Sequence, residues 1–472
     1  MIEFSDVKFK SEDELLDKLF NTALKKCEDN IVSFGDRDVL VEGGGYEKIW
    51  LETQPMGGRM YAKKNITVAL NNQLMFMEHR RKDGRIPGSI ALEAGKVIPQ
   101  FNKFQGFCFP EPALDMYFIA NAGEDYLDEL YECLEGFDKY LWENRDSDGD
   151  GCLESWCKYD TGEDNAVRYK NAPDAWSAEF PPEGLSIVPM ASLDVMSYSY
   201  SSRYTLSRIA YLKGKEKLGD EWAKLAGGVR AKIREYLWDA EAHICFDRDK
   251  HHRKQKIITH NTLRAMYWGS IDKDMASKFV NDHLLNEKEF WTYMPLPSVS
   301  VSDPNFVNEP TNNWSGQCEA LTYQRAINAL EKYGYDHLIP YLGRKLFDAI
   351  GKDLLFVQQY DPFNGKPSVN EDTGGRNGYG PALLSVIEYM AAMYGVRRKE
   401  NNLIWGCMQG TSYEYKQILG DDTYLIRNKD DETTAFINGN KIFGTKKNVK
   451  IITDLRGNVV KATDIYKIED RK

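Results

Sequence analysis

Amphipathic helical segments joined by long loops are the feature of this sequence that most limits its fold. From residue 11 to residue 397, apolar residues recur three and four positions apart, which predicts about ten helices that each bury one face. The first begins at Ser11, where Glu14 completes a capping box. The others are expected at 63–80, 112–122, 125–143, 192–213, 216–237, 261–285, 317–333, 335–350 and 380–397.

The loops between these segments are rich in Gly, Pro, Asn and Asp, and the long ones span 81–111, 144–191, 286–316 and 353–379. Loops of that length inside a compact domain usually carry function or are disordered. Their Trp, Tyr and Asp residues favour function. Helices that alternate with elaborate loops predict a helical toroid, in which antiparallel pairs form two rings and the loops form a pit at one end.

The pattern changes after Arg398. Short β-branched segments such as 423–426, 434–437 and 449–453 are separated by turns of Gly, Asp and Asn. We therefore predict a mainly α fold in two parts. A helical barrel would span residues 1–399, and a small β-rich segment would span residues 400–472.

Charge and composition narrow the function. A net charge of −11 argues against a nucleic-acid partner, because binding a polyanion needs clustered Lys and Arg. No stretch reaches the roughly 20 apolar residues of a membrane span, and the first residues do not resemble a secretory signal. Eight cysteines without a CxxC pair are expected to be reduced core residues. A cytoplasmic protein is the expectation.

An acidic turn follows the helix expected at 125–143. Asp146, Asp148 and Asp150 occupy positions 1, 3 and 5 of a Ca²⁺-binding loop. The twelfth position is Cys157 rather than Glu, so the segment is not an EF-hand. Two interpretations stay open: a structural Ca²⁺ site, or an Asp/Gly turn that ends the helix.

A second acidic loop carries Asp160, Glu163 and Asp164. Glycoside hydrolysis needs a protonated carboxylic acid beside the leaving oxygen, and a second carboxylate that activates water or attacks the sugar. This loop could supply the acid, with the negative charges of Asp160 and Glu163 raising the pKa of Asp164. Taken alone, however, an acidic loop is more often plain protein surface.

The run Asp160-Thr-Gly-Glu-Asp-Asn-Ala-Val-Arg-Tyr169 resembles the Glu-Ser-Gly-Met/Trp-Asp-Asn-Ser-Pro-Arg-Trp motif of glycoside hydrolase families 63 and 37. This is the group of processing α-glucosidases, trehalases and mannosylglycerate hydrolase-like enzymes. The resemblance implies an (α/α)6 barrel, with Asp164 at the position of the general acid and Arg168 at that of the motif's arginine. The mild departures from the motif are Asp160, Val167 and Tyr169.

Other segments resemble the same group in the same order. Pro55–Arg59 is similar to a Pro-Gly-Gly-Arg-Phe substrate loop, which implies that Arg59 contacts a sugar hydroxyl. Further matching segments include Ser192–Tyr198, Trp238–Asp239 and Asn313–Gln317. Trp314, Tyr360 and Tyr379 are either core residues or aromatic platforms that stack on sugar rings.

The second catalytic position departs from the family. The family's base is the Glu of a Glu-Xaa-Tyr-Asp/Asn-Pro segment, where this chain has Gln358-Gln-Tyr-Asp-Pro. A neutral amide cannot accept a proton from water near pH 7. Three explanations stay open. Another carboxylate, Glu371 or Glu319, serves as the base; or an external nucleophile such as phosphate replaces water; or the chain binds sugar without efficient turnover.

Together these features predict an inverting glycosidase that removes one sugar from the end of a small α-linked glucoside or related glycoside. Asp164 would be the acid, and Glu371 or Glu319 the base. The residues expected to bind substrate are Arg59, Arg168, Trp314, Gln358 and Tyr360. The chemistry requires no cofactor, so a metal is expected only as the candidate Ca²⁺ of the acidic turn.

Two rival classes remain. A carbohydrate-binding protein on a retired enzyme scaffold would bind sugar equally well after the change Asp164→Asn. An isomerase, epimerase or lyase on the same toroid would usually enlist a His as acid or base. In every case the partner is a small carbohydrate.

Overall fold

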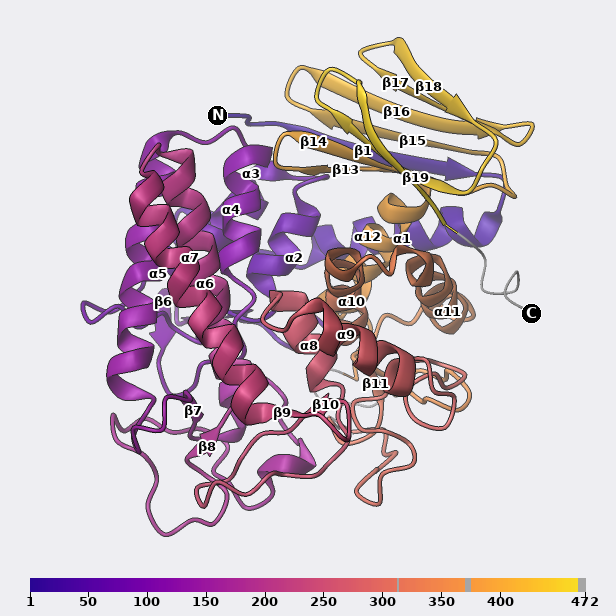
Figure 1. Ribbon diagram of the computed structural model, residues 1–472. Helices are drawn as coiled ribbons and strands as arrows, with labels where there is room; N and C mark the ends of the chain where they lie inside the picture. Colours follow the sequence, from indigo (N-terminus) through magenta and orange to yellow (C-terminus); the bar gives the residue numbers. More distant parts are fainter. Residues whose placement is uncertain (312–313, 370–374, 466–472) are drawn as a thin grey trace.

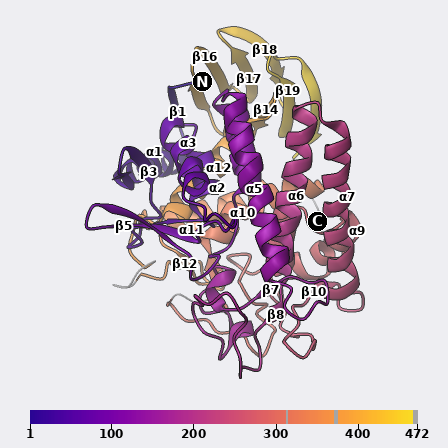
Figure 2. The same ribbon diagram turned by 90° about the vertical axis from the view of Figure 1, so that its left-hand side faces the viewer.

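The computed structural model of the protein describes residues 1–311, 314–369 and 375–465. Its twelve described α-helices form two concentric rings (Figures 1 and 2). The inner helices are α2 (Gln54–Tyr61), α4 (Pro110–Ile119), α6 (Leu193–Leu212), α8 (Asn261–Trp268), α10 (Ala320–Tyr333) and α12 (Gly380–Tyr394). Each inner helix contacts the next, and α12 contacts α2, which closes the ring. The predicted (α/α)6 barrel is confirmed.

The outer helices alternate with the inner ones along the chain. They are α1 (Glu14–Asp29), α3 (Ile66–Glu78), α5 (Glu124–Asn144), α7 (Glu216–Lys232), α9 (Lys273–Phe279) and α11 (Ile339–Gly351). Helix α1 shows why they lie outside, because it buries one stripe and exposes the opposite face to water. The residues of that stripe are Leu16, Leu19, Phe20, Ala23, Leu24 and Cys27.

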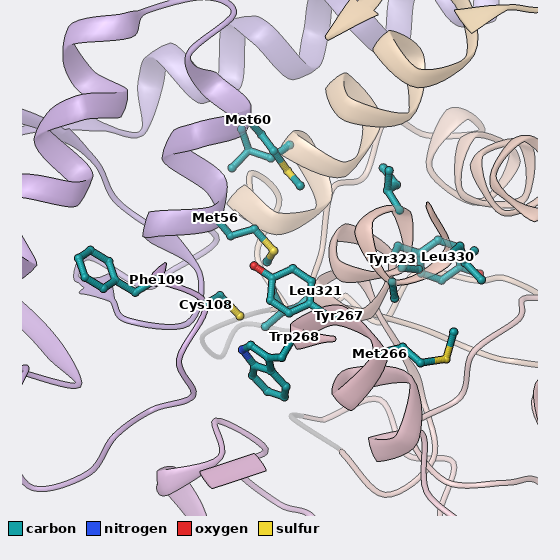
Figure 3. Packing of buried hydrophobic residues seen from close by; sticks show 14 of the residues in the cluster. Met56, Met60, Cys108, Phe109, Met266, Tyr267, Trp268, Leu321, Tyr323 and Leu330 are labelled. Carbon is teal, nitrogen blue, oxygen red and sulfur yellow. The ribbon is translucent and has the colours of Figure 1, made fainter. Parts of the chain in front are cut away.

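The inner helices are apolar on more than one face. Helices α2, α8 and α12 are buried at every position, as expected of helices that are surrounded by others. Figure 3 shows Met56 of α2, Tyr267 of α8 and Leu321 of α10 meeting in the barrel interior. The middle of the barrel is therefore packed with side chains. All eight cysteines are buried free thiols, as predicted.

Two differences from the expected helices have simple causes. The segment 261–285 is two helices, because Gly269 adopts a left-handed conformation (φ 78°) that ends α8. Asp272 then caps α9 by accepting from the backbone N–H groups of Asp274 and Met275. Helix α2 was not predicted, since its sequence contains one Pro and two Gly and its complete burial leaves no amphipathic stripe.

Two antiparallel sheets cover one end of the barrel (Figure 1). The first sheet contains β1 (Ser5–Ser11), β15 (Tyr413–Leu419), β16 (Asp422–Lys429), β17 (Glu432–Ile437) and β18 (Asn440–Thr445). The second contains β13 (Val396–Lys399), β14 (Asn402–Cys407), β19 (Val449–Asp454) and β20 (Val459–Asp464). Strand β1 pairs with β15, so the N-terminal segment contributes to the β-rich part that the sequence analysis assigned to 400–472.

Short elements organise the loops. The remaining strands are β2 (Ile31–Phe34), β3 (Arg37–Leu40), β4 (Ile49–Trp50), β5 (Ser89–Glu93), β6 (Lys96–Gln100), β7 (Glu154–Ser155), β8 (Met190–Ala191), β9 (Trp238–Asp239), β10 (Ile244–Cys245), β11 (Cys318–Glu319) and β12 (Gln359–Tyr360). Short 3₁₀ or π turns lie at Lys158–Asp160, Val167–Tyr169, Ile233–Leu237, Val280–Leu284 and Asp336–Leu338. The loops with β7, β8 and β10 gather at the end away from the sheets (Figures 1 and 2). Within the described chain, every helix is too short or too polar to cross a bilayer.

Candidate active site

A pocket of about 250 Å³ opens among the loops. Its walls come mainly from the loops that lead into the inner helices α2, α4, α6, α10 and α12, with Leu321 from the first turn of α10. The lining residues are Glu42, Tyr46, Trp50, Glu52, Thr53, Lys103, Gln105, Tyr159, Gly162, Asp164, Trp314, Leu321, Gln358 and Tyr379. Three of the residues predicted from sequence, Asp164, Trp314 and Gln358, thus meet in one pocket.

The loop that carries Asp164 is held from behind by Asp160. The Asp160 carboxylate is fully buried, accepts from the backbone N–H of Phe104 (3.0 Å) and Trp156 (2.8 Å), and forms an ion pair with Arg145 (2.8 Å). Burial would raise the pKa of Asp160, but the guanidinium of Arg145 and these N–H donors lower it overall. Asp160 therefore anchors the loop, and its charge is compensated.

Glu163 lies in a buried cluster of charges behind the pocket. Its carboxylate pairs with Arg168 and with Arg264 (3.1 Å), and it bonds to His260 Nε2 (2.8 Å). Burial would raise the pKa of Glu163, but Arg264 and Arg168 hold it well below the usual range. Arginines therefore compensate the charges of both Asp160 and Glu163.

Arg168 belongs to the same cluster and does not line the pocket. Besides Glu163, its guanidinium contacts Asp194 (2.9 Å) and Asp247. All four side chains are at least 94% buried. The position expected to contact sugar is therefore occupied by a residue that fastens the acid loop to α6 and to the segment after β10.

Two more residues expected to bind substrate lie elsewhere. Arg59 pairs with Asp115 (3.1 Å) and Glu388 (3.0 Å), beside a separate small cavity next to the C-terminal sheets. Tyr360 is fully buried, and its hydroxyl bonds to the backbone of Leu355. Both side chains therefore make contacts inside the barrel and not with the pocket. A match to a motif does not show in which direction a side chain points.

Gln358 and Trp314 contribute one wall of the pocket each. The Gln358 amide oxygen accepts from the Tyr46 hydroxyl (3.1 Å). Trp314 is held with its ring edge-on to His260, at 6.0 Å between centroids. An aromatic ring and an amide beside a carboxylic acid are suitable groups for holding a sugar ring.

The sequence offered two carboxylates as the catalytic base, Glu371 and Glu319. Glu371 falls outside the described residues. Glu319 is fully buried in β11, accepts from Gln359 Nε2 (2.8 Å), and does not line the pocket. Burial raises the pKa of Glu319 well above the usual range, and because its side chain does not line the pocket, it does not reach a substrate there.

Sequence reasoning missed two pocket carboxylates, Glu42 and Glu52. Glu52 forms an ion pair with Arg325 and lies 3.6 Å from Arg264, so two guanidinium groups already compensate its charge. Glu42 accepts from the Tyr379 hydroxyl (3.2 Å), and burial raises its pKa to about 8. The available signal was the run of three glycines after Glu42, which marks a tight backbone path.

Cations also face the pocket. Lys103 is buried and its Nζ lies 5.3 Å from the ring centre of Trp50, with Lys48 on the same ring at 5.5 Å. Burial and, to a smaller extent, the charge of Lys48 lower the pKa of Lys103 to about 8. The pocket thus combines aromatic, acidic, amide and cationic groups.

The acidic turn forms a different cluster. Asp148 and Asp150 lie near His252, with ligand atoms within 4.8 Å of one another. Asp146 instead accepts from the backbone N–H of Gly151 (3.2 Å), and Asp150 accepts from that of Cys152 (2.7 Å). Such bonds are those of a turn that ends a helix, here α5. A Ca²⁺ ion at this turn stays a proposal.

A family model decides what this barrel is. Residues 50–377 match the mannosylglycerate hydrolase MGH1-like glycoside hydrolase domain. The chain belongs to this family. The protein is therefore a glycosidase, and the match includes Asp164, Trp314 and Gln358. No curated protein sequence matches the chain.

Solved structures of glycosidases share the fold. The family 63 mannosylglycerate hydrolase from Thermus thermophilus, in complex with glucose, is 17% identical with a TM-score of 0.62, covering 78% of this glycosidase and 99% of that chain. Neutral trehalase from Saccharomyces cerevisiae is 15% identical, covers 76% of both chains and has a TM-score of 0.53.

An α-L-rhamnosidase from Dictyoglumus thermophilum is 14% identical with a TM-score of 0.61, covering 98% of this glycosidase and 50% of that chain. That match is long enough to include the C-terminal sheets. At such low identities the likeness concerns the fold alone.

Proposed function

We propose that the protein removes a terminal glucose-like unit from a small α-linked glycoside, with inversion of the anomeric configuration. The observation that carries this proposal is the meeting of Asp164, Trp314 and Gln358 in one pocket. The volume of about 250 Å³ is near the lower end for ligand pockets, which suits one sugar ring with a small leaving group and favours action on chain ends.

In this proposal Asp164 is the general acid. Its Oδ1 lies 3.5 Å from Gln105 Nε2, and the carboxyl group is only partly buried, so a glycosidic oxygen can reach it. Asp164 would give its proton to that oxygen as the bond to the anomeric carbon breaks. Water would attack from the other face of the ring, and the two catalytic carboxyl groups would stand ~6.5–9.5 Å apart.

Phosphorolysis is the second candidate. Gln358 occupies the family's base position, and a phosphate nucleophile needs no base. The buried cation Lys103 in the same pocket would favour an anion. The two reactions give different products, a free sugar or a sugar 1-phosphate, so a single incubation in phosphate buffer separates them.

The test of Asp164 uses a panel of α-glucosides, followed by NMR of the first anomer released. Asp164→Asn should lower kcat on substrates with poor leaving groups by about 10²–10⁴-fold, since general acid catalysis supplies that much, while an activated glucosyl fluoride still reacts. The matched control is Asp174→Asn, an exposed acid of the same long loop, which should keep full activity. Undiminished activity of Asp164→Asn on all substrates would remove it from the mechanism, and sugar binding without turnover by the wild type would indicate a binding protein.

A further inference from the structure

An inverting site needs a second carboxylate as its base. Three side chains that line the described pocket can be compared for this role: Gln358, Glu52 and Glu42. Gln358 is neutral, and the charge of Glu52 is compensated by Arg325 and Arg264. Glu42 is the remaining acidic side chain besides Asp164 among the residues that line the pocket. It has no cationic partner within 4.0 Å in the described part of the chain.

The backbone around Glu42 is tightly fixed. The carbonyl of Glu42 accepts from the N–H of Gly380, the first residue of α12, and its own N–H donates to the carbonyl of Lys48 (3.2 Å). Gly43 and Gly44 follow with φ of 73° and 63°. A Cβ on Gly43 would lie 2.5 Å from the Gly378 carbonyl oxygen, so this turn packs directly on the segment before α12.

The Glu42 side chain lies on the same wall as Gln358. Tyr379 donates to Glu42, Tyr46 donates to Gln358 (3.1 Å), and the two tyrosine rings pack with centroids 6.2 Å apart. Glu42 is 6% exposed, and its open side faces the pocket that holds Asp164. Two packed tyrosines thus hold Glu42 and Gln358 in the lining of the same pocket.

We propose that Glu42 is the catalytic base, in place of the glutamate that Gln358 replaced; this inference rests on the proposed hydrolytic function. Glu42 accepts a proton from water as the water oxygen bonds to the anomeric carbon. The bond from that carbon to the leaving oxygen breaks, and Asp164 protonates this oxygen. One water is consumed, and solvent returns the proton from Glu42 to Asp164.

The pH dependence of the reaction follows from the surroundings of Glu42. Burial and, to a smaller extent, the negative charge of Asp164 raise the pKa of Glu42 to about 8, against the hydrogen bonds from Tyr379 and Thr53. A base must be ionised, so with a glucosyl fluoride, which needs no proton from Asp164, kcat/KM should rise as pH increases through about 8. The other titratable groups that line the pocket are Tyr46, Glu52, Lys103, Tyr159, Asp164 and Tyr379.

The test compares Glu42→Gln with Glu47→Gln, an exposed glutamate of the same turn. Glu42→Gln should lower kcat about 10²–10⁴-fold on both a poor-leaving-group glucoside and a glucosyl fluoride, because water activation is needed for each. The rise of kcat/KM near pH 8 should disappear. Glu47→Gln should match the wild type, and formate should restore activity to Glu42→Ala by filling the vacated space.

Several outcomes would overturn the proposal. Glu42→Gln could lose activity on the glucoside and keep it on the fluoride, which would make Glu42 a proton donor. It could stay fully active while Glu319→Gln is inactive, which would move the base to Glu319. Failure of formate to restore Glu42→Ala, with an unchanged thermal unfolding curve, also counts against it. The proposed function fails in a distinct way, through an Asp164→Asn variant that stays active on every substrate.

Discussion

Glu163 and Asp164 are adjacent in sequence and have different surroundings. Glu163 is buried among Arg168, Arg264 and His260, whereas Asp164 lines the pocket. A carboxylate next to two guanidinium groups cannot exchange protons near neutral pH, since its pKa is held low. The loop therefore separates its two acids into one that fixes the backbone and one that is available for chemistry.

Arg168 is expected to contribute to the free energy of unfolding rather than to bind substrate directly. Arg168→Ala would leave Glu163, Asp194 and Asp247 without their shared cation, and breaking a buried ion pair costs about 3–5 kcal/mol. Urea unfolding would measure this loss. Arg427→Ala, which removes an exposed arginine paired with the exposed Glu414, should cost less than about 1 kcal/mol. Equal losses for the two variants would contradict the assignment.

Sequence reasoning predicted those pocket residues that lie in segments resembling a family motif. These are Asp164, Trp314 and Gln358, and each lies in a loop that leads into an inner helix. The glycine run after Glu42 marked a turn but could not place its side chain in the pocket, since its partner Tyr379 is 337 residues away. Contacts over such distances depend on closure of the ring, which periodicity along the chain does not reveal.

At the scale of secondary-structure elements, the position of the loop that carries Asp164 depends on Gly162. Gly162 adopts φ of 76°, and a Cβ there would lie 2.2 Å from Glu52 Oε2. Gly162→Ala must therefore displace either the loop that carries Asp164 or the side chain of Glu52, which Arg325 holds in place. Both line the pocket, and a shift of about 1 Å can cost 10²-fold in rate. Gly184→Ala is the matched control, because Gly184 has φ of 73° and open space around it.

Steady-state kinetics of the two variants would test this dependence. We expect a large fall in kcat/KM for Gly162→Ala and little change for Gly184→Ala, although both substitutions strain the backbone equally. Similar kinetics for the pair would show that strain alone, rather than the contact with Glu52, determines the loop position.

The burial pattern of a helix determines how easily it is predicted from the sequence. Outer helices such as α1 have one buried stripe, so their periodicity stands out. The inner helices α2, α8 and α12 are buried at every position. Of these, only the short α2 was not predicted, because it has a Pro-Met-Gly-Gly sequence of low helix propensity. Its helical form is imposed by its neighbours α3, α4 and α12, all of which contact it.

At the scale of the molecule, the barrel has a catalytic end and a sheet-covered end. Phe9 of β1 lies in the core of the sheet-covered end. Its ring packs against Phe20 of α1 (5.4 Å between centroids), Tyr394 of α12 (6.2 Å) and Tyr413 of β15 (6.3 Å). Stability and catalysis should therefore respond separately to changes at the two ends.

Phe9→Ala is expected to lower the free energy of unfolding by about 3–5 kcal/mol, the usual cost of emptying an aromatic site in a core. Activity at room temperature should be unchanged, because Phe9 packs at the sheet-covered end of the barrel. Lys10→Ala, on the exposed side of the same strand, is the control. Thermal unfolding and kinetics of both variants, measured side by side, would show a loss of activity in Phe9→Ala if the two ends were coupled.

The pairing of β1 with β15 has a consequence for biosynthesis. Residues 5–11 leave the ribosome about 400 residues before their partner strand, residues 413–419. At translation rates of 5–20 residues per second, the early strand waits roughly 20–80 s with an unpaired edge and an uncovered Phe9. Newly made chains are thus exposed to aggregation and to chaperones during this interval, and the first sheet can form around β1 only after β15 has been synthesised.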